Sequence, residues 1–185
     1  FSHIDGLINN AGTLNPLVPL NELSLRDWHQ SFKTNVDAPL ILSQKLYDKL
    51  TNGRVLNIGS GAAYFPIKGW AAYCVTKAAL SMLTQCWQLE SDSVAFSSVM
   101  PGIINTDMQA LARSGQAMDA SQLAFYKQLK ERNSLVEPEV VAAFLMWLLL
   151  DVDSATYSSK EWDIYDTTHH KGWLKPPHHV PHWES

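Results

Sequence analysis

Residues 57–80 read NIGSGAAYFPIKGWAAYCVTKAAL, and the rest of the chain is organised around this stretch. It begins as a strand, turns through the small residues that follow Ser60, and continues as a helix that carries Tyr73 and Lys77. Residues four apart lie on one face of a helix, so we expect the phenol and the ammonium to be within reach of each other. A free phenol titrates near ~10, and a neighbouring ammonium favours the phenolate and moves the pKa of the phenol towards neutrality. With Ser60 hydrogen-bonding the same substrate oxygen, these side chains are typical of proton transfer to a carbonyl that receives a hydride.

A Tyr-x-x-x-Lys pair on its own is a weak signal, because most such pairs lie half-exposed on the surface of a helix. Here Ser60 stands thirteen residues before Tyr73, and both follow an apolar strand expected at residues 54–59. This context favours a catalytic site over a surface pair.

The same stretch resembles the active-site segment of the short-chain dehydrogenase/reductase family. Three segments are similar to its sepiapterin reductase and benzil reductase branch: KGWAAYCVTKAAL (68–80), PGIINTDMQALAR (101–113) and WDIYD (162–166). The resemblance covers residues 4–166 and implies an α/β fold with a doubly wound, Rossmann-like parallel sheet. It also implies a nicotinamide cofactor, NADPH more than NAD, a small-molecule carbonyl substrate and a homodimer.

Size and composition agree with a globular protein of one domain. The chain has 185 residues, 46% of them hydrophobic, and a net charge of −4. A nucleic-acid or anionic-membrane partner is not expected at this charge, and no uninterrupted apolar run is long enough to span a membrane. Cys74 and Cys86 are expected on one helix (residues 70–90), about 18 Å apart and unable to pair. Together with the lack of a signal peptide, this predicts a cytoplasmic protein.

Two loops that follow strands are candidate cofactor contacts. Residues 10–12 (Asn-Ala-Gly) come after an apolar strand expected at 4–9, and open α/β sheets bind ligands at the carboxyl ends of their strands. Residues 101–106 follow a strand expected at 94–100, and Thr106 is placed to cap the next helix. On spacing alone both are ordinary loops. The resemblance puts the first beside the dinucleotide and the second at its nicotinamide end.

A helix is expected after Ser24, with an apolar stripe of Leu25, Trp28, Phe32 and Val36 facing the sheet. Further along, Pro39 has no N–H, so the carbonyl of Asn35 loses its helical partner. This is either a harmless kink or, as the resemblance implies, the main-chain carbonyl that holds a proton-relaying water near the active-site lysine.

The last strand is expected at residues 161–166 and carries Asp163 between apolar residues. A carboxylate there needs a partner, and a salt bridge or an exposed strand end would supply one. The resemblance to sepiapterin reductase implies instead that Asp163 binds the amino-pyrimidine edge of a pterin.

Residues 167–185 are rich in His and Pro and lack periodicity. Clustered histidines suggest a metal, but their spacing is irregular and proline breaks any scaffold, so we expect a loose tail and no metal site.

No Gly-rich phosphate loop precedes the first strand, which matches the fourth strand of the family fold. We therefore expect residues 1–166 to be the C-terminal part of a Rossmann-like reductase domain. The residue that selects NAD or NADP would precede this part.

These inferences predict an NADPH-dependent carbonyl reductase in which Tyr73 is the proton donor. The alternatives are a reductase specific for a pterin side-chain ketone, and a non-catalytic fragment or scaffold that does not bind cofactor. The predicted catalytic group is Ser60, Tyr73, Lys77 and Asn35. The predicted cofactor contacts are Asn10, Ala11, Gly12, Tyr73, Lys77, Pro101, Gly102, Ile104 and Thr106. The predicted substrate contacts are Ser60, Trp70 and Asp163.

Overall fold

The computed structural model describes residues 2–181 and has a parallel sheet at its centre. Its four strands follow the order of the chain: β1 (Gly6–Asn9), β2 (Arg54–Ile58), β3 (Ala95–Met100) and β4 (Trp162–Asp163). Val55 lies opposite Leu7 in β1 and Phe96 in β3, and Val99 lies opposite Trp162. The expected α/β fold with a parallel sheet is confirmed.

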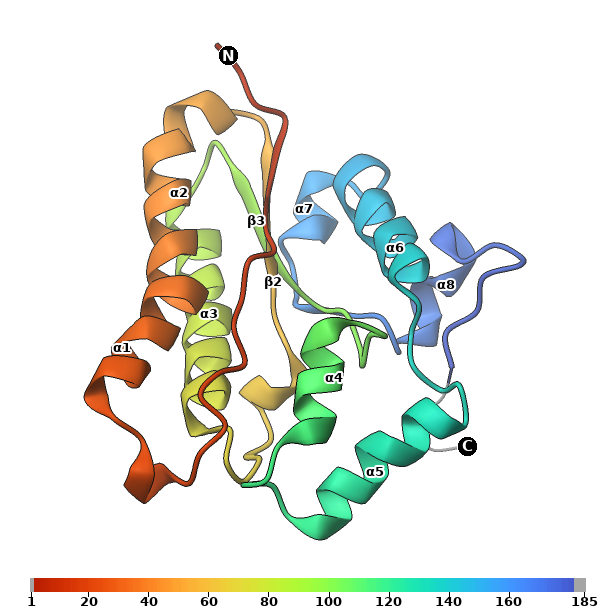
Figure 1. Cartoon of the computed structure of the whole chain (residues 1–185). Helices are drawn as coiled ribbons and strands as arrows, with labels where there is room; N and C mark the ends of the chain where they lie inside the picture. Colours follow the sequence, from red (N-terminus) through yellow and green to blue (C-terminus); the bar gives the residue numbers. More distant parts are fainter. Residues whose placement is uncertain (1, 182–185) are drawn as a thin grey trace.

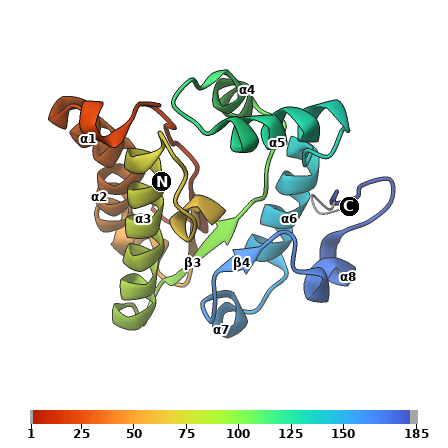
Figure 2. The ribbon, with the colours of Figure 1, turned by 90° about the horizontal axis from the view of Figure 1, so that it is seen from below.

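Helices cover both faces of this sheet (Figures 1 and 2). One face is covered by α1 (Leu25–Phe32), a π-helical segment (Lys33–Asp37), α2 (Ala38–Leu46) and α3 (Ala71–Glu90). The other face is covered by α6 (Pro138–Leu150), α7 (Ser154–Tyr157) and α8 (His170–Trp173). Two further helices, α4 (Asp107–Ser114) and α5 (Ala120–Glu131), lie beyond the carboxyl ends of the strands. Short 3₁₀ turns occupy Leu20–Glu22, Tyr47–Leu50, Gly61–Ala63 and Thr167–His169.

Local signals in the sequence determine several helix starts. The Ser24 hydroxyl accepts a hydrogen bond from the N–H of Asp27 (3.1 Å), and the Thr106 hydroxyl accepts one from Gln109 (3.4 Å). Both are the caps expected from the sequence. No helix in the described part of the chain is long and apolar enough to cross a membrane.

The face of α1 and α2 that packs inward differs from the expected one. Leu25 is 74% exposed, and Trp28, Phe32 and Val36 are only half-buried. The buried residues form a second stripe at spacings of four, made of Ser31, Asn35, Pro39 and Ser43. These side chains are small or hydrogen-bonded, which lets the helix approach α3 closely, so the prediction of an apolar stripe facing the sheet is wrong at Leu25.

Pro39 lies two residues after the end of the π-helical segment. Ala38 caps this segment, and its N–H donates to the carbonyl of Lys33, five residues earlier. Pro39 cannot donate to the carbonyl of Asn35, and single π turns of this kind occur often at functional sites. The irregularity expected from Pro39 is therefore a π turn, and the water-relay role of Asn35 remains a prediction.

The last strand is much shorter than the six residues expected. Only Trp162 and Asp163 pair with β3. The carboxylate of Asp163 then accepts the N–H of Tyr165 (2.9 Å), which closes a turn and ends the strand.

The expectation of a loose tail is wrong for residues 167–173. They form a 3₁₀ turn and α8, and His169 and Trp173 are buried against α6. Aromatic packing against Phe144 and Trp147, which the sequence pattern did not reveal, holds this segment. His178 and His179 are exposed, and His182 lies outside the described residues.

Candidate active site

Two adjoining cavities lie at the carboxyl ends of the strands. The larger has a volume of about 870 Å³ and the smaller about 470 Å³. Five residues line both cavities and so form the boundary between them: Ser60, Trp70, Gly102, Ile103 and Tyr126.

Every residue predicted to contact the cofactor lines the smaller cavity. Its lining includes Asn10, Ala11, Gly12, Tyr73, Lys77, Pro101, Gly102, Ile104 and Thr106. These residues come from three separate segments of the chain, which meet because parallel strands present their carboxyl ends at one edge of the sheet. Their roles towards a cofactor remain predictions.

Lys77 is a buried cation at the wall of the smaller cavity. Its ammonium donates to the carbonyl of Ile58 at 2.7 Å and lies 5.6 Å from the centroid of the Tyr73 ring. Burial lowers the pKa of Lys77 to about 8. An ammonium has three donors. Since one of them is used within the described chain, two are left for hydroxyl groups of a bound ligand.

Tyr73 is also buried, and its acidity differs from the expected one. Burial raises the pKa of its phenol above 10.0, and a hydrogen bond with Ser60 lowers it by a smaller amount. The expected lowering by Lys77 is wrong for this state of the protein, since desolvation outweighs any effect of the ammonium. At neutral pH the phenol therefore keeps its proton, as a proton donor must.

Asn35 lines neither cavity but connects the residues that do. Its side-chain oxygen accepts the N–H of Thr13 (2.8 Å), and its side-chain nitrogen donates to the Thr13 carbonyl and the Thr76 hydroxyl (both 2.9 Å). Thr76 in turn donates to the carbonyl of Tyr73 (2.9 Å). The side chain of Asn35 therefore fixes the loop around Gly12 to the helix that carries Tyr73. The sequence argument considered only the Asn35 carbonyl and missed this bond network.

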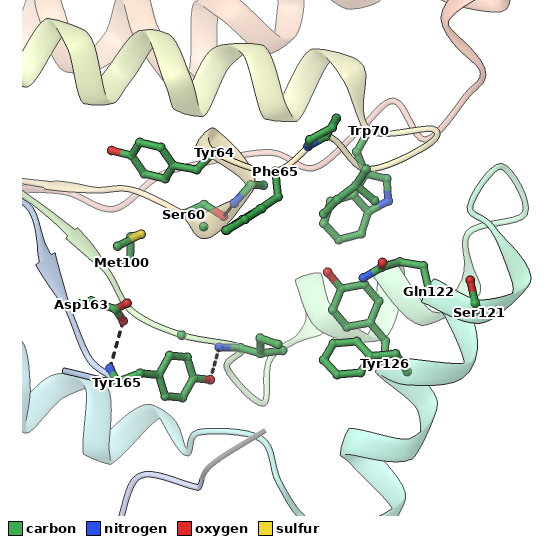
Figure 3. A pocket seen from close by; sticks show the side chains of 17 residues that line it. Ser60, Tyr64, Phe65, Trp70, Met100, Ser121, Gln122, Tyr126, Asp163 and Tyr165 are labelled. Atoms are coloured by element: carbon green, nitrogen blue, oxygen red, sulfur yellow. Dashed lines mark hydrogen bonds between the residues drawn. The ribbon is translucent and has the colours of Figure 1, made fainter. Parts of the chain in front are cut away.

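Aromatic rings dominate the wall of the larger cavity (Figure 3). Trp70 stacks on Tyr126 with ring centroids 5.6 Å apart and planes at 4°, and meets the edge of Tyr73 at 5.9 Å. Trp70 was predicted from the sequence, whereas Tyr126 on α5 was not. The only signal was the Phe125–Tyr126 pair in a loosely amphipathic segment.

Asp163 and Tyr165 form the β4 side of the larger cavity (Figure 3). Tyr165 receives a hydrogen bond from the N–H of Ile103 (3.0 Å) and so holds the loop after β3. Gly102 in that loop has φ of +79°, and a Cβ there would stand 2.9 Å from the Tyr165 oxygen. Among the described residues Asp163 has no ion pair, so the salt-bridge interpretation is wrong. Its partner is the Tyr165 N–H, and the carboxylate is only half-buried.

Tyr64 forms a further wall of the larger cavity, through a hydrogen-bond network that the sequence did not indicate. Its hydroxyl donates to Glu161 and lies 2.9 Å from the hydroxyl of Ser81. Glu161 also accepts the hydroxyl proton of Ser98 at 2.7 Å. The loop after Ser60 is thereby fixed to α3, β3 and the start of β4.

A parallel α/β sheet with a serine, a tyrosine and a lysine around its strand ends defines the class of protein. Residues 1–117 match the family model described as short chain dehydrogenase. The chain belongs to this family of oxidoreductases.

Known relatives and a solved structure agree with this assignment. The chain is 36% identical over 166 residues to benzil reductase ((S)-benzoin forming) of Bacillus subtilis, covering 85% of this chain and 67% of the relative. It is 35% identical over 150 residues to sepiapterin reductase of Rattus norvegicus, covering 77% of this chain and 57% of the relative. A short chain dehydrogenase/reductase of Saccharomyces cerevisiae superposes with a TM-score of 0.86 at 29% identity, over 92% of this chain and 70% of that one. The chain thus spans about two thirds or less of the length of these two relatives.

Proposed function

We propose that this chain belongs to an NADPH-dependent carbonyl reductase in which Tyr73 donates a proton to the carbonyl oxygen of a ketone. The observation that carries this proposal is the position of Ser60 on both cavities, with Tyr73 and Lys77 on the smaller one. A ketone in the larger cavity would lie beside a proton donor and beside the proposed cofactor cavity.

The smaller cavity suits a nicotinamide nucleotide. A Cβ on Gly12 would lie in van der Waals contact with the Lys77 nitrogen and the Asn35 side-chain oxygen, 3.6 Å from each, so the absence of a side chain leaves the space beside Lys77 to a ligand. The two remaining donors of Lys77 suit ribose hydroxyls, and the loop of residues 101–106 would meet the nicotinamide. NADPH supplies the hydride when bound. The preference for NADPH over NAD rests on the resemblance to the sepiapterin and benzil reductase branch.

The side chains of the protein would supply the proton that the carbonyl oxygen needs. Tyr73 holds its proton at neutral pH and would release it to the substrate oxygen as the carbonyl carbon is reduced. Ser60 would orient that oxygen and stabilise the resulting phenolate, together with the nearby Lys77. The Asn35 carbonyl would hold the water that returns a proton to Lys77 and Tyr73.

Titration of the complete protein with NADPH, followed by nicotinamide fluorescence, tests cofactor binding. We expect a saturable change in fluorescence. A flat titration would favour a scaffold that does not bind cofactor.

Two substrate classes fit the larger cavity. Its rings, among them Trp70, Tyr126 and Tyr165, suit an aromatic or vicinal diketone such as benzil, which the Bacillus subtilis relative reduces by its name. A pterin side-chain ketone is the alternative, and Asp163 is the residue that would distinguish it. We favour the broader carbonyl reductase, because the residues from Asn57 to Trp70 resemble the benzil reductase segment at least as well.

The substitution Asp163→Asn tests the choice of substrate. A pterin offers adjacent N–H donors that a carboxylate can accept in parallel, whereas a diketone offers none. Loss of the charge should lower kcat/KM for sepiapterin about tenfold or more, and leave benzil reduction much less affected. Asparagine can still accept the Tyr165 N–H, so the turn should persist. Equal losses on both substrates would mean that Asp163 is structural, and a parent protein that does not reduce sepiapterin would favour the diketone.

We further propose a homodimer through α2 and α3. Large apolar side chains are exposed on these helices, among them Leu42 (45%), Val75 (42%) and Met82 (59%). A self-complementary contact at a two-fold axis would bury them. Light scattering at micromolar concentration should give a dimer mass for the complete protein. Leu42→Lys should lower that mass, whereas Leu150→Lys on the opposite face should not. A parent protein that is monomeric under these conditions would contradict the proposal.

A further inference from the structure

Residues 167–173, which follow the last strand, hydrogen-bond the backbone of the cavity wall that Asp163 and Tyr165 form. The indole N–H of Trp173 lies 2.9 Å from Nδ1 of His169, and Nε2 of His169 lies 2.9 Å from the carbonyl oxygen of Asp163. An indole nitrogen only donates, so Nδ1 must be the acceptor. The proton of the imidazole is therefore on Nε2, which donates to Asp163. This arrangement requires a neutral His169.

The neighbouring histidine makes a parallel contact. Nε2 of His170 lies 2.7 Å from the carbonyl oxygen of Ile164. Two successive histidines thus bind the carbonyls of two successive residues, Asp163, which lines the larger cavity, and Ile164 beside it. The sheet itself contributes little there, because β4 has only two residues, and Ile164 adds one further bond to Met100 (3.0 Å).

Aromatic packing keeps His169 in place. The residue is 9% exposed, and its ring stacks on Phe144, with centroids 5.0 Å apart and planes at 7°. Trp147 lies 5.5 Å away in a similar orientation, and Trp162 meets it edge-on at 5.5 Å. These rings cover most of the imidazole, so little solvent can replace a hydrogen bond that His169 loses.

We propose that neutral His169 is a positioning residue, which fixes the cavity wall of Asp163 and Tyr165 and releases it when it is protonated. This inference rests on the proposed reductase function and concerns the affinity for the ketone. His169 touches neither cavity and acts only through the backbone of β4 and the turn that follows.

Protonation would place an N–H on Nδ1, facing the indole N–H that now donates to it. Burial lowers the pKa of His169 below 6.5 and outweighs the hydrogen bond to the Asp163 carbonyl, which raises this pKa. Asp166 also raises the pKa of His169, and His170 and Lys160 lower it. The α6 and β4 side chains stacked on it, Phe144, Trp147 and Trp162, are uncharged. The imidazole binds a proton more readily when it has left its packed position than when it is buried. The packing of His169 against Trp173 and Asp163 therefore weakens as the pH falls below about 6.5.

The test compares KM for the ketone at pH 7.5 and pH 5.5 in the complete protein, with the Kd for NADPH measured in parallel. For the parent, KM should rise about fivefold or more at the lower pH, the effect of losing one or two hydrogen bonds, while the Kd for NADPH changes much less. His169→Gln keeps a donor for Asp163 and an acceptor for Trp173 but does not titrate. It should show a KM near that of the parent at pH 7.5 and no rise at pH 5.5. His169→Phe should show a high KM at both values, and His179→Gln, in the exposed tail, should behave as the parent.

A pH dependence of KM that persists in His169→Gln would overturn the inference. The indole N–H signal of Trp173 in NMR spectra gives a readout that is independent of activity. It should shift with pH between 7.5 and 5.5 in the parent and stay constant in His169→Gln. If the parent is inactive but its Trp173 signal shifts with pH, the reductase function is refuted, whereas the pH-dependent contact between His169 and Trp173 is supported. A parent signal that does not move would refute the role of His169, whatever the activity.

Discussion

Replacing Tyr73 with phenylalanine is expected to lower kcat for ketone reduction by about 100-fold or more, and to leave the Kd for NADPH nearly unchanged. The substitution removes one oxygen from a buried ring and keeps the edge contact with Trp70. Removal of the oxygen deletes the proposed proton donor while the lining of the smaller cavity persists. The effect should therefore fall on the chemical step and not on cofactor binding.

Tyr47→Phe is the matched control for this experiment. It removes a phenol oxygen that hydrogen-bonds Ser91 and Ser93 at the opposite end of the sheet. It should alter stability slightly and leave kcat unchanged. If Tyr73→Phe kept activity within a few-fold of the parent, Tyr73 would not be the proton donor.

Lys77→Met is expected to make the chain more stable and the complete enzyme nearly inactive. The pKa of Lys77 falls from 10.5 to about 8 because the ammonium is buried. A difference of this size corresponds to a cost of roughly 3 kcal/mol for holding the charge at neutral pH. Methionine has a similar shape and no charge, but it loses the charge-assisted bond to the Ile58 carbonyl, which offsets about 2 kcal/mol. Unfolding by urea at pH 7 should show a gain of about 1 kcal/mol.

The burial of Lys77 also predicts how the stability of the parent changes with pH. The folded pKa lies below the unfolded one, so the unfolded chain binds more protons between pH 8 and pH 10.5. This group therefore makes the parent more stable as the pH rises through that window, and the Met variant should lack this contribution. Lys127→Met, at an exposed position on α5, should show neither effect. A Lys77→Met variant that is less stable than the parent at pH 7 would contradict the burial argument.

The positions of the predicted site residues were largely readable from the sequence. The predicted cofactor contacts Gly12 and Thr106 occur in a loop and at a helix start directly after apolar strands, and Lys77 lies in the second turn of the helix that follows β2. In a parallel sheet, that local pattern is sufficient to bring them to one edge. The helix caps at Ser24 and Thr106 were predictable for the same reason, because both partners of each bond lie within one turn.

The features that the sequence did not predict depend on partners far away in the chain. His169 is buried because Phe144 and Trp147 stack on it, and no periodicity in residues 167–185 reveals this. The inward face of α1 and α2 was misplaced because hydrogen bonds of Asn35, and not hydrophobicity, determine which side meets α3. The pKa of Tyr73 was expected to fall because its burial was not known from the sequence.

The fate of the hydride tests the central proposal most directly. The complete protein is incubated with benzil, and in a parallel sample with sepiapterin, in the presence of NADPH that carries deuterium at both C4 positions. The products are analysed by mass spectrometry and NMR. The account predicts one deuterium on the carbinol carbon and a hydroxyl proton that exchanges with solvent. Unchanged benzil and sepiapterin, or a carbinol carbon without deuterium, would contradict it.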